Sequence, residues 1–332
     1  MADVILELQD VQKYYPIVKG AFHQVVGHVK AVDGVSLTLN RGETLGLVGE
    51  SGCGKTTLGK CIVGLHEATG GKILYTLNDE KRDLLSMNKK ERFAMKRRIQ
   101  MVFQDPYSSL NPSQTILQAF NEPMQIHGIG KTRAERIERI AQLLETVQLP
   151  ADYMNRFPHE FSGGQRQRIC IARALALNPD FILCDEPVSA LDVSIQAQVI
   201  NMFAELQEKF GLTYLFIAHD LLVVRHISDR IAVMYLGKMV ELANANEIYD
   251  HPLHPYSKSL LSAVPVPDPK IARANQRIVL SGDIPSPLNA PSGCPFRTRC
   301  PYACDKCAES MPDFQEVSAG HFVACHRVGE IN

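Results

Sequence analysis

Continuous apolar runs of strand length recur along the first 245 or so residues of the chain. They cover Thr44 to Val48, Ile99 to Phe103, Phe181 to Cys184 and Thr213 to Ile217. Uninterrupted runs of this length are typical of strands that are buried on both faces of a parallel sheet. Between them, apolar residues recur at helical spacing, for example at Leu58, Cys61, Ile62 and Leu65, and from Ile195 to Phe210. This alternation predicts a layered α/β domain.

The pattern changes near Asn246 to Pro255, where the chain becomes rich in Pro, Gly, Cys and His. A chain of 332 residues suggests about two domains. We therefore expect one domain over residues 1–250 and a C-terminal extension over 251–332. The basic run at 89–98 and the amphipathic pattern at 132–147 are most simply solvated helices.

Charge and hydrophobicity argue against nucleic-acid binding and against a membrane-spanning helix. The 35 basic and 36 acidic side chains leave a net charge of −1, so no overall field attracts nucleic acid, and no nucleic-acid partner is expected. No apolar run approaches the roughly 20 residues that a membrane-spanning helix needs. The first residues carry acids and lack the basic segment of a signal peptide, so we expect a protein that stays in the cytoplasm.

A phosphate-binding loop follows the first predicted parallel strand. The segment Gly49-Glu-Ser-Gly-Cys-Gly-Lys-Thr-Thr57 matches the pattern G-x-x-x-x-G-K-[ST] and opens a predicted helix. Its glycines let backbone N–H groups turn toward phosphate oxygens. Lys55 is expected to neutralise the β- and γ-phosphates, and the Thr56 hydroxyl to bind Mg²⁺. The candidate nucleotide-binding residues here are Gly49, Ser51, Gly52, Cys53, Gly54, Lys55, Thr56 and Thr57.

Polar side chains also end two other predicted strands. Asp185 and Glu186 follow the run at 181–184, and His219 follows the run at 213–217. The carboxyl ends of strands in open α/β sheets form the ligand-binding edge. We expect Asp185 to serve Mg²⁺, Glu186 to act as general base on a water, and His219 to contact the γ-phosphate.

The segment Phe161-Ser-Gly-Gly-Gln-Arg-Gln-Arg resembles the signature of ATP-binding-cassette (ABC) ATPases. Together with Gln104, the segment Ser189-Ala-Leu-Asp192 and His219, it matches that family across residues 4–245. The resemblance implies that Gln104 is the Q-loop residue, which contacts Mg²⁺ and the region that meets the transmembrane subunits. It also implies that Asp192 is the D-loop acid and His219 the switch histidine.

The resemblance assigns two further parts of the ATP site. Adenine is expected to stack on Tyr15, with Tyr14 as the alternative. Ser162, Gly163, Gly164 and Gln165 open an apolar-periodic helix and so form a second anion-binding helix terminus. In the family this turn faces the phosphate loop of a second subunit, so that two chains enclose each ATP.

The C-terminal segments narrow the resemblance. His251-Pro-Leu-His-Pro-Tyr-Ser-Lys-Ser and Leu280-Ser-Gly-Asp-Ile-Pro-Ser-Pro are similar to the extension of oligopeptide/dipeptide permease ATP-binding subunits, and the Lys13-Tyr-Tyr-Pro segment resembles the F-type subunit. The implied fold is an α/β P-loop NTPase of the ABC nucleotide-binding type with a helical signature subdomain, plus a small Cys/Pro-rich C-terminal extension. The implied function is ATP hydrolysis that drives peptide uptake.

Partners and location follow from the same resemblance. It implies a heterodimer with a paralogous D-type ATPase, two transmembrane permease subunits, an extracytoplasmic peptide-binding protein, and a peripheral place on the cytoplasmic face of the bacterial inner membrane. Two alternatives stay open. The same cassette can import nickel or another small solute, or the chain is a non-transport ABC ATPase whose cysteine lobe senses a metal.

The spacing Cys294-x5-Cys300-x6-Cys307-x17-Cys325 resembles the cysteine pattern of the permease extension. Four thiolates can hold a [4Fe–4S] cluster, which we favour, or tetrahedral Zn²⁺, and metal-free buried thiols are the third possibility. Cys304 is left over, and His321 and His326 are spare ligands. The other thiols, Cys53, Cys61, Cys170 and Cys184, are expected to be core or loop residues.

Overall fold

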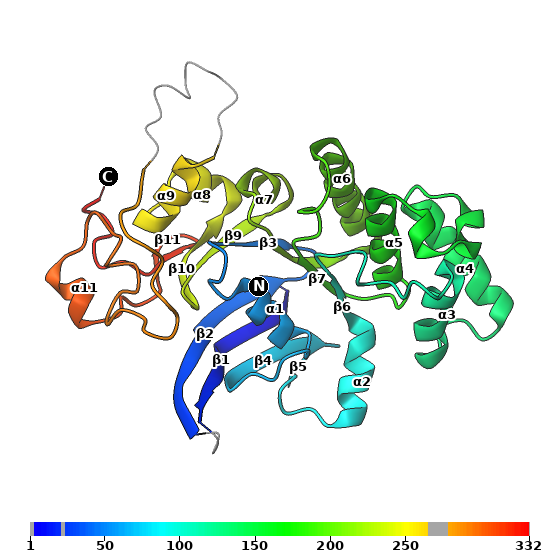
Figure 1. Ribbon diagram of the computed structural model, residues 1–332, viewed down its shortest axis with the longest axis horizontal. Coiled ribbons are helices and arrows are strands. Elements are labelled where there is room, and N and C mark those ends of the chain that lie inside the picture. Colours follow the sequence, from blue (N-terminus) through cyan, green and yellow to red (C-terminus); the bar gives the residue numbers. More distant parts are fainter. Residues whose placement is uncertain (1–2, 21–23, 265–277, 332) are drawn as a thin grey trace. The chain divides into compact units, whose positions relative to one another are not determined.

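The computed structural model describes residues 3–20, 24–264 and 278–331 of the chain (Figure 1). The chain divides into two compact units. The first comprises residues 1–40, 44–85 and 218–332, and the second comprises residues 41–43 and 86–217. Among the helices of the described ranges, none has the length and apolar character to cross a membrane.

An antiparallel sheet in the order β2-β1-β4-β5 forms one part of the first unit (Figure 1). Its strands are β1 (Val4–Lys19), β2 (Gln24–Asn40), β4 (Gly70–Leu77) and β5 (Glu80–Asp83). Leu6, Leu8, Val35 and Ile73 turn from these strands into the core. Helix α1 (Lys55–Ile62) packs against β1 and β2, so the loop before α1 lies near this sheet.

The remaining strands of the first unit are ordered β11-β12-β10-β9-β3. They are β3 (Thr44–Val48), β9 (Arg230–Tyr235), β10 (Lys238–Asn244), β11 (Gln315–Ser318) and β12 (His321–Val323). β3 and β9 are parallel, whereas β10 and β12 are antiparallel, with Glu241 opposite Val323. The C-terminal hairpin thus extends the sheet that begins with β3.

Short helices accompany these strands. They are α7 (Leu221–Ile227), α8 (Ala245–Asp250), α9 (Pro255–Ser262) and α11 (Asp305–Glu309). Helix α7 contacts β3, and α8 contacts β9 and β10 (Figure 1). Phe296 brings the C-terminal segment into the core, since its ring packs against Tyr235 and Tyr256.

The second unit contains three parallel strands in the order β8-β7-β6. They are β6 (Ile99–Val102), β7 (Phe181–Asp185) and β8 (Thr213–Ile217). Every residue of β7 and β8 is buried, as expected for strands covered on both faces.

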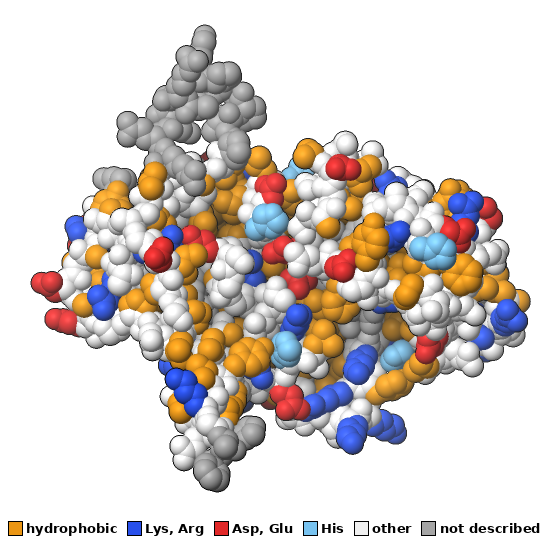
Figure 2. Space-filling view, in the orientation of Figure 1, with side chains coloured by type: hydrophobic (Ala, Val, Ile, Leu, Met, Phe, Trp, Pro, Cys, Tyr) orange, Lys and Arg blue, Asp and Glu red, His pale blue; other side chains and the backbone are white. Residues whose placement is uncertain are grey.

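Helices complete the second unit. They are α2 (Lys89–Arg98), α3 (Ile116–Ile126), α4 (Arg133–Thr146), α5 (Gly163–Leu175) and α6 (Val193–Phe210), with 3₁₀ turns at Ala151–Asn155 and Pro158–Glu160. Helix α5 contacts β6, α3, α4 and α6. Most residues of α2 are exposed, and Figure 2 shows Lys and Arg side chains gathered over it.

The predicted α/β alternation is confirmed. The four apolar runs form β3, β6, β7 and β8, and the helical patterns form α1, α2, α4 and α6. The expected domain boundary at about residue 250 stays a prediction.

Candidate functional site

The phosphate-binding loop joins β3 to α1 in the first unit. Gly49 and Gly54 both have positive φ, 150° and 108°. A Cβ at Gly49 would lie 2.2 Å from the Met234 carbonyl oxygen, and one at Gly54 would lie 2.1 Å from the Ala31 carbonyl oxygen. Only glycine fits at these two positions, because any side chain would collide with a fixed backbone. The loop is therefore held closely against β9 and β2.

Lys55 lies inside the loop, with 6% of its surface exposed. Its ammonium donates to the carbonyl oxygens of Gly49 (2.7 Å) and Glu50 (3.1 Å). An incoming phosphate group would offer this cation charged acceptors in place of neutral ones. Ser51 and Gly52 are exposed at the tip, Cys53 is buried beneath it, and Thr56 and Thr57 are half-buried in the first turn of α1.

Tyr14 and Tyr15 are neighbours on β1 with different contacts. The Tyr14 hydroxyl donates to Asp33, and burial together with this bond raises the pKa of Tyr14 to about 12. Both rings lie under an ammonium, Tyr14 under that of Lys30 (5.4 Å from the ring centroid) and Tyr15 under that of Lys13 (4.8 Å), and Tyr15 also forms a T-shaped pair with His66. The expected stacking of adenine on Tyr15, with Tyr14 as the alternative, stays a prediction.

His219 is exposed at the start of the loop that leads into α7. The preceding Ala218 donates its N–H to the Leu47 carbonyl of β3 (3.4 Å), and the following Asp220 caps α7 through Leu222 N–H (2.9 Å). The backbone on both sides of the histidine is thus fixed.

The second unit brings Gln104 and Glu186 together. The Gln104 carboxamide donates to the Glu186 carboxylate (Nε2 to Oε2, 2.8 Å). Glu186 has a left-handed φ of 48°, a costly conformation for a glutamate, and its N–H donates to the Ile217 carbonyl (2.9 Å). Asp185 is only 5% exposed, whereas Glu186 is half-buried. The two acids therefore have different surroundings.

The predicted signature residues form a capped helix terminus. Ser162 accepts from Gln165 N–H (3.4 Å), and the Gln165 carboxamide oxygen accepts from Ser162 N–H (3.0 Å). This capping box begins α5, with Gly163 and Gly164 in its first turn. A pocket of about 620 Å³ is lined by all four residues and by Asp192. The structure thus gathers the signature turn and the D-loop acid around one hollow.

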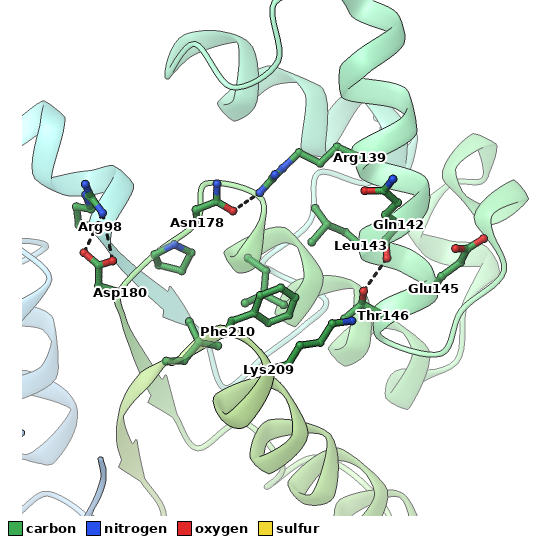
Figure 3. A pocket seen from close by; sticks show the side chains of 13 residues that line it. Arg98, Arg139, Gln142, Leu143, Glu145, Thr146, Asn178, Asp180, Lys209 and Phe210 are labelled. Atoms are coloured by element: carbon green, nitrogen blue, oxygen red, sulfur yellow. Dashed lines mark hydrogen bonds and ion pairs between the residues drawn. The ribbon is translucent and has the colours of Figure 1, made fainter. Parts of the chain in front are cut away.

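A different pocket of the second unit, about 800 Å³ in volume, contains none of the predicted site residues (Figure 3). Figure 3 shows Arg98 paired with Asp180 and Arg139 directed toward Asn178. Burial lowers the pKa of Arg139, and the nearby Arg97 contributes. Arg98 and Asp180 thus bond each other, and Arg139 bonds the Ala176 carbonyl and the Asn178 side chain.

The four cysteines proposed as ligands lie close enough to influence one another's ionisation. Cys294 and Cys307 are buried, and Cys300 and Cys325 are half-buried. Burial, with a smaller contribution from the other three thiols, raises the pKa of Cys294 to about 12. Within the described ranges, however, no group of three or more His, Cys, Asp or Glu is arranged to hold a metal ion. The [4Fe–4S] cluster and the zinc alternative therefore both stay predictions.

The leftover residues of that prediction are engaged elsewhere. His321 is not a spare ligand, because its Nε2 lies 2.7 Å from the buried Glu241 carboxylate. His326 contacts the Ser310 carbonyl (3.0 Å), and the Cys304 sulfur lies 3.6 Å from that of Cys307. The other thiols, Cys53, Cys61, Cys170 and Cys184, are buried, as expected.

Two residues that contact the phosphate loop were not assigned from the sequence. The Tyr256 hydroxyl accepts from Glu50 N–H (2.7 Å), and Arg299 pairs with the Glu50 carboxylate. Tyr256 lies in the His-Pro-Leu-His-Pro-Tyr segment, which could have drawn attention to it. Arg299 directly precedes Cys300 of the predicted cysteine cluster, and no sequence pattern indicates its contact with Glu50.

Comparison with known proteins agrees with these features. Residues 32–189 match the family model described as ABC transporter, and residues 240–307 match the model of the oligopeptide/dipeptide transporter C-terminal region. The chain is 56% identical over 325 residues to the oligopeptide transport ATP-binding protein AppF of Bacillus subtilis, covering 98% of this chain and 97% of the relative. It is 51% identical to OppF of Salmonella typhimurium over 98% of this chain and 96% of the relative.

Solved structures extend the agreement to the fold. A dimeric ATP-binding cassette in a post-hydrolysis state, bound to ADP and Pi, superposes with a TM-score of 0.63 and 29% identity, covering 73% of this chain and 99% of that chain. The chain belongs to the ATP-binding-cassette family of transporter ATPases, in the branch that carries the oligopeptide/dipeptide C-terminal region.

Proposed function

We propose that this protein hydrolyses ATP to drive the import of dipeptides or oligopeptides through a pair of membrane permeases. The near-full-length identity of 56% to a relative named as an oligopeptide transport ATP-binding protein carries this proposal. Other relatives at 54% identity are named putative peptide import ATP-binding proteins. The C-terminal region supports the same substrate class, because residues 240–307 match the oligopeptide/dipeptide model.

In the proposed ATP site, Tyr15 stacks on adenine and the loop from Gly49 to Thr57 binds the phosphates. Lys55 exchanges the loop carbonyls for phosphate oxygens, since its ammonium already lies within the loop. Glu186 accepts a proton from the attacking water, and the bond from Gln104 holds the Glu186 carboxylate in place. His219 contacts the γ-phosphate.

Mg²⁺ suits the oxygen donors that the resemblance assigns to it. These are the Thr56 hydroxyl, the Gln104 carboxamide and the Asp185 carboxylate, all hard ligands. When bound, Mg²⁺ would neutralise charge on the β- and γ-phosphates. The Asp185 carboxylate lies at the end of β7 and is 5% exposed.

The signature turn is proposed to serve a second ATPase subunit. Ser162 and the N–H groups of Gly163 and Gly164 open a helix of 13 residues, and such a terminus attracts phosphate. The hollow of about 620 Å³ that they share with Asp192 would receive the phosphates of a nucleotide bound by a D-type paralogue. Replacement of Ser162 by Tyr, with the matching change in the paralogue, should abolish hydrolysis by the assembled complex. Unchanged hydrolysis would contradict the shared site.

The proposed assembly comprises this chain, the D-type paralogue, two permeases and an extracytoplasmic peptide-binding protein. It would place the chain on the cytoplasmic face of a bacterial inner membrane. The test is reconstitution of the purified complex in lipid vesicles, with ATP-dependent uptake of a labelled dipeptide, a labelled pentapeptide and a nickel chelate measured in parallel. Peptide uptake is expected. Uptake of nickel alone would favour the alternative substrate, and co-purification without permeases would favour a non-transport ATPase.

We also propose that Cys294, Cys300, Cys307 and Cys325 bind a [4Fe–4S] cluster. Support comes from backbone donors: the N–H groups of Phe296, Tyr302 and Arg327 bond the sulfurs of Cys294, Cys300 and Cys325. Each donor lies two residues beyond its cysteine, and such bonds stabilise thiolates. The chemistry of the donor set therefore fits the cluster.

Metal analysis of anaerobically purified protein tests this assignment. About four iron and four sulfide per chain are expected. About one zinc would favour the tetrahedral alternative. Metal-free protein that folds normally would show that these thiols are structural.

A further inference from the structure

The C-terminal segment holds the phosphate loop through one glutamate. Arg299 donates twice to the Glu50 carboxylate, from Nη1 to Oε2 (2.7 Å) and from Nη2 to Oε1 (3.0 Å). The Tyr256 hydroxyl accepts from Glu50 N–H (2.7 Å). Both the side chain and the backbone of this loop residue are thus fixed by residues about 200 to 250 positions later in the chain.

Arg299 is itself firmly placed. Its side chain is 8% exposed, and its Nη1 lies 3.4 Å from the Tyr235 hydroxyl. Its backbone N–H donates to the Phe296 carbonyl (3.0 Å), and the Phe296 ring packs against Tyr235 and Tyr256. The bonds to Glu50 raise the pKa of Arg299, so the guanidinium stays charged. A partly buried, two-point ion pair with this support has a defined geometry.

The ion pair of Arg299 with Glu50 affects the charge of the phosphate loop. Glu50 directly follows Gly49, and its own carbonyl accepts from the Lys55 ammonium. A carboxylate beside a loop that binds a polyanion opposes phosphate binding unless a cation neutralises it. The guanidinium of Arg299, which donates two hydrogen bonds, both neutralises the carboxylate and fixes its position.

We propose that Arg299 is a positioning residue of the ATP site. It acts through Glu50, because it neutralises and fixes a carboxylate that would otherwise repel the phosphates of the nucleotide. This inference rests on the proposed function, because it requires ATP at the Gly49–Thr57 loop. It assigns the C-terminal extension a direct influence on nucleotide affinity, carried by one ion pair.

The alternative is that the pair only stabilises the fold. The two roles differ in the behaviour of the double variant. If Arg299 serves to neutralise Glu50, then removing the glutamate charge as well should restore affinity. If the pair is only structural, then the double variant should be no better than Arg299→Gln alone.

The experiment measures equilibrium binding of ATP, without Mg²⁺ so that hydrolysis does not proceed, by full-length protein. Wild type is compared with Arg299→Gln, Glu50→Gln and the double variant. Arg297→Gln is the matched control, because it removes a cation two residues away whose side chain bonds Ser292 instead. Circular dichroism melting checks the fold of each. If Arg299→Gln does not fold, then Arg299→Met, an apolar chain of similar length, replaces it in the cycle.

Arg299→Gln should raise the Kd for ATP about tenfold, since it leaves one unneutralised carboxylate in the loop that binds the phosphates. Arg299→Gln should raise the Kd for ADP by a smaller factor, because ADP carries less negative charge. Glu50→Gln and the double variant should bind within about threefold of wild type, and Arg297→Gln within about twofold.

Two results would overturn the inference: unchanged ATP affinity in folded Arg299→Gln, or a double variant as weak as that single variant. Failure of the wild type to bind ATP would instead refute the proposed function, and this inference with it.

Discussion

The carboxamide of Gln104 donates to the carboxylate of Glu186 across 2.8 Å, although 82 residues separate them in the chain. Both were expected in the ATP site from the sequence, and the second unit brings their side chains together. The bond leaves one carboxylate oxygen of Glu186 outside this contact and restrains its direction. A restrained carboxylate is what a general base requires.

Glu186→Gln should slow ATP hydrolysis by the assembled complex by roughly 10²- to 10⁴-fold, because the amide cannot accept the proton of the attacking water. ATP affinity should change little, since the shape of the side chain is kept. Phosphate release and nucleotide binding are measured on the same preparation. Glu205→Gln, an exposed change on α6, is the control. Turnover within a few-fold of wild type would refute the role as general base.

Lys55→Ala should raise the Kd for ATP at least about tenfold, because it removes the only ammonium bonded to the loop carbonyls of Gly49 and Glu50 in the described part of the chain. The comparison is Lys60→Ala, a half-buried cation in the last turn of the same helix. Calorimetric titration with ATP measures both. Equal affinities for the two variants would contradict phosphate binding by Lys55.

The sequence predicts the parts of the site that depend on local pattern. Apolar runs mark β3, β7 and β8, and the serine before two glycines marks the capped start of α5, because burial and capping involve residues near in sequence. The long strands β1 and β2 were not anticipated, since many of their residues are exposed and bulges interrupt their pairing. Such strands lack a regular alternation.

Contacts between distant residues could not be predicted. The pairing of Arg299 with Glu50 spans 249 positions, and no pattern at either residue indicates the other. His321 was named from the sequence as a spare ligand for the predicted cysteine cluster. Its actual partner, Glu241, lies 80 positions earlier on β10. Pairing between strands, which places β12 beside β10, determines this contact.

Glu241→Ala should destabilise the protein by about 3 to 5 kcal/mol. This carboxylate is fully buried and accepts from Leu253 N–H (2.7 Å), His254 N–H (3.0 Å) and the His321 ring. Alanine would leave two backbone donors and a ring nitrogen without their acceptor. Urea unfolding measures the change, with the exposed Glu247→Ala expected within about 0.5 kcal/mol of wild type. A similar loss in both variants would show that Glu241 contributes no more than a surface acid.

The protein should lose stability as the pH falls below about 6.5, in part because of His254. Complete burial lowers the pKa of His254 to about 4 in the folded protein, although the nearby Glu241 opposes this shift. An unfolded histidine has a pKa near 6.5. Between these values the unfolded chain binds a proton that the folded chain does not, so acid favours unfolding.

Protonation of His254 in the unfolded chain should lower the free energy of unfolding by about 2 kcal/mol between pH 7 and pH 5. His254→Asn removes the titrating group and keeps a side-chain acceptor for Tyr256 N–H, which His254 Nδ1 now binds at 3.1 Å. Between pH 7 and pH 5 the variant should therefore lose about 2 kcal/mol less unfolding free energy than wild type loses. Urea unfolding at the two pH values measures this difference. His251→Asn, an exposed neighbour, should retain the loss seen in wild type. If His254→Asn and wild type lose the same free energy, then His254 is not the group whose protonation weakens the fold.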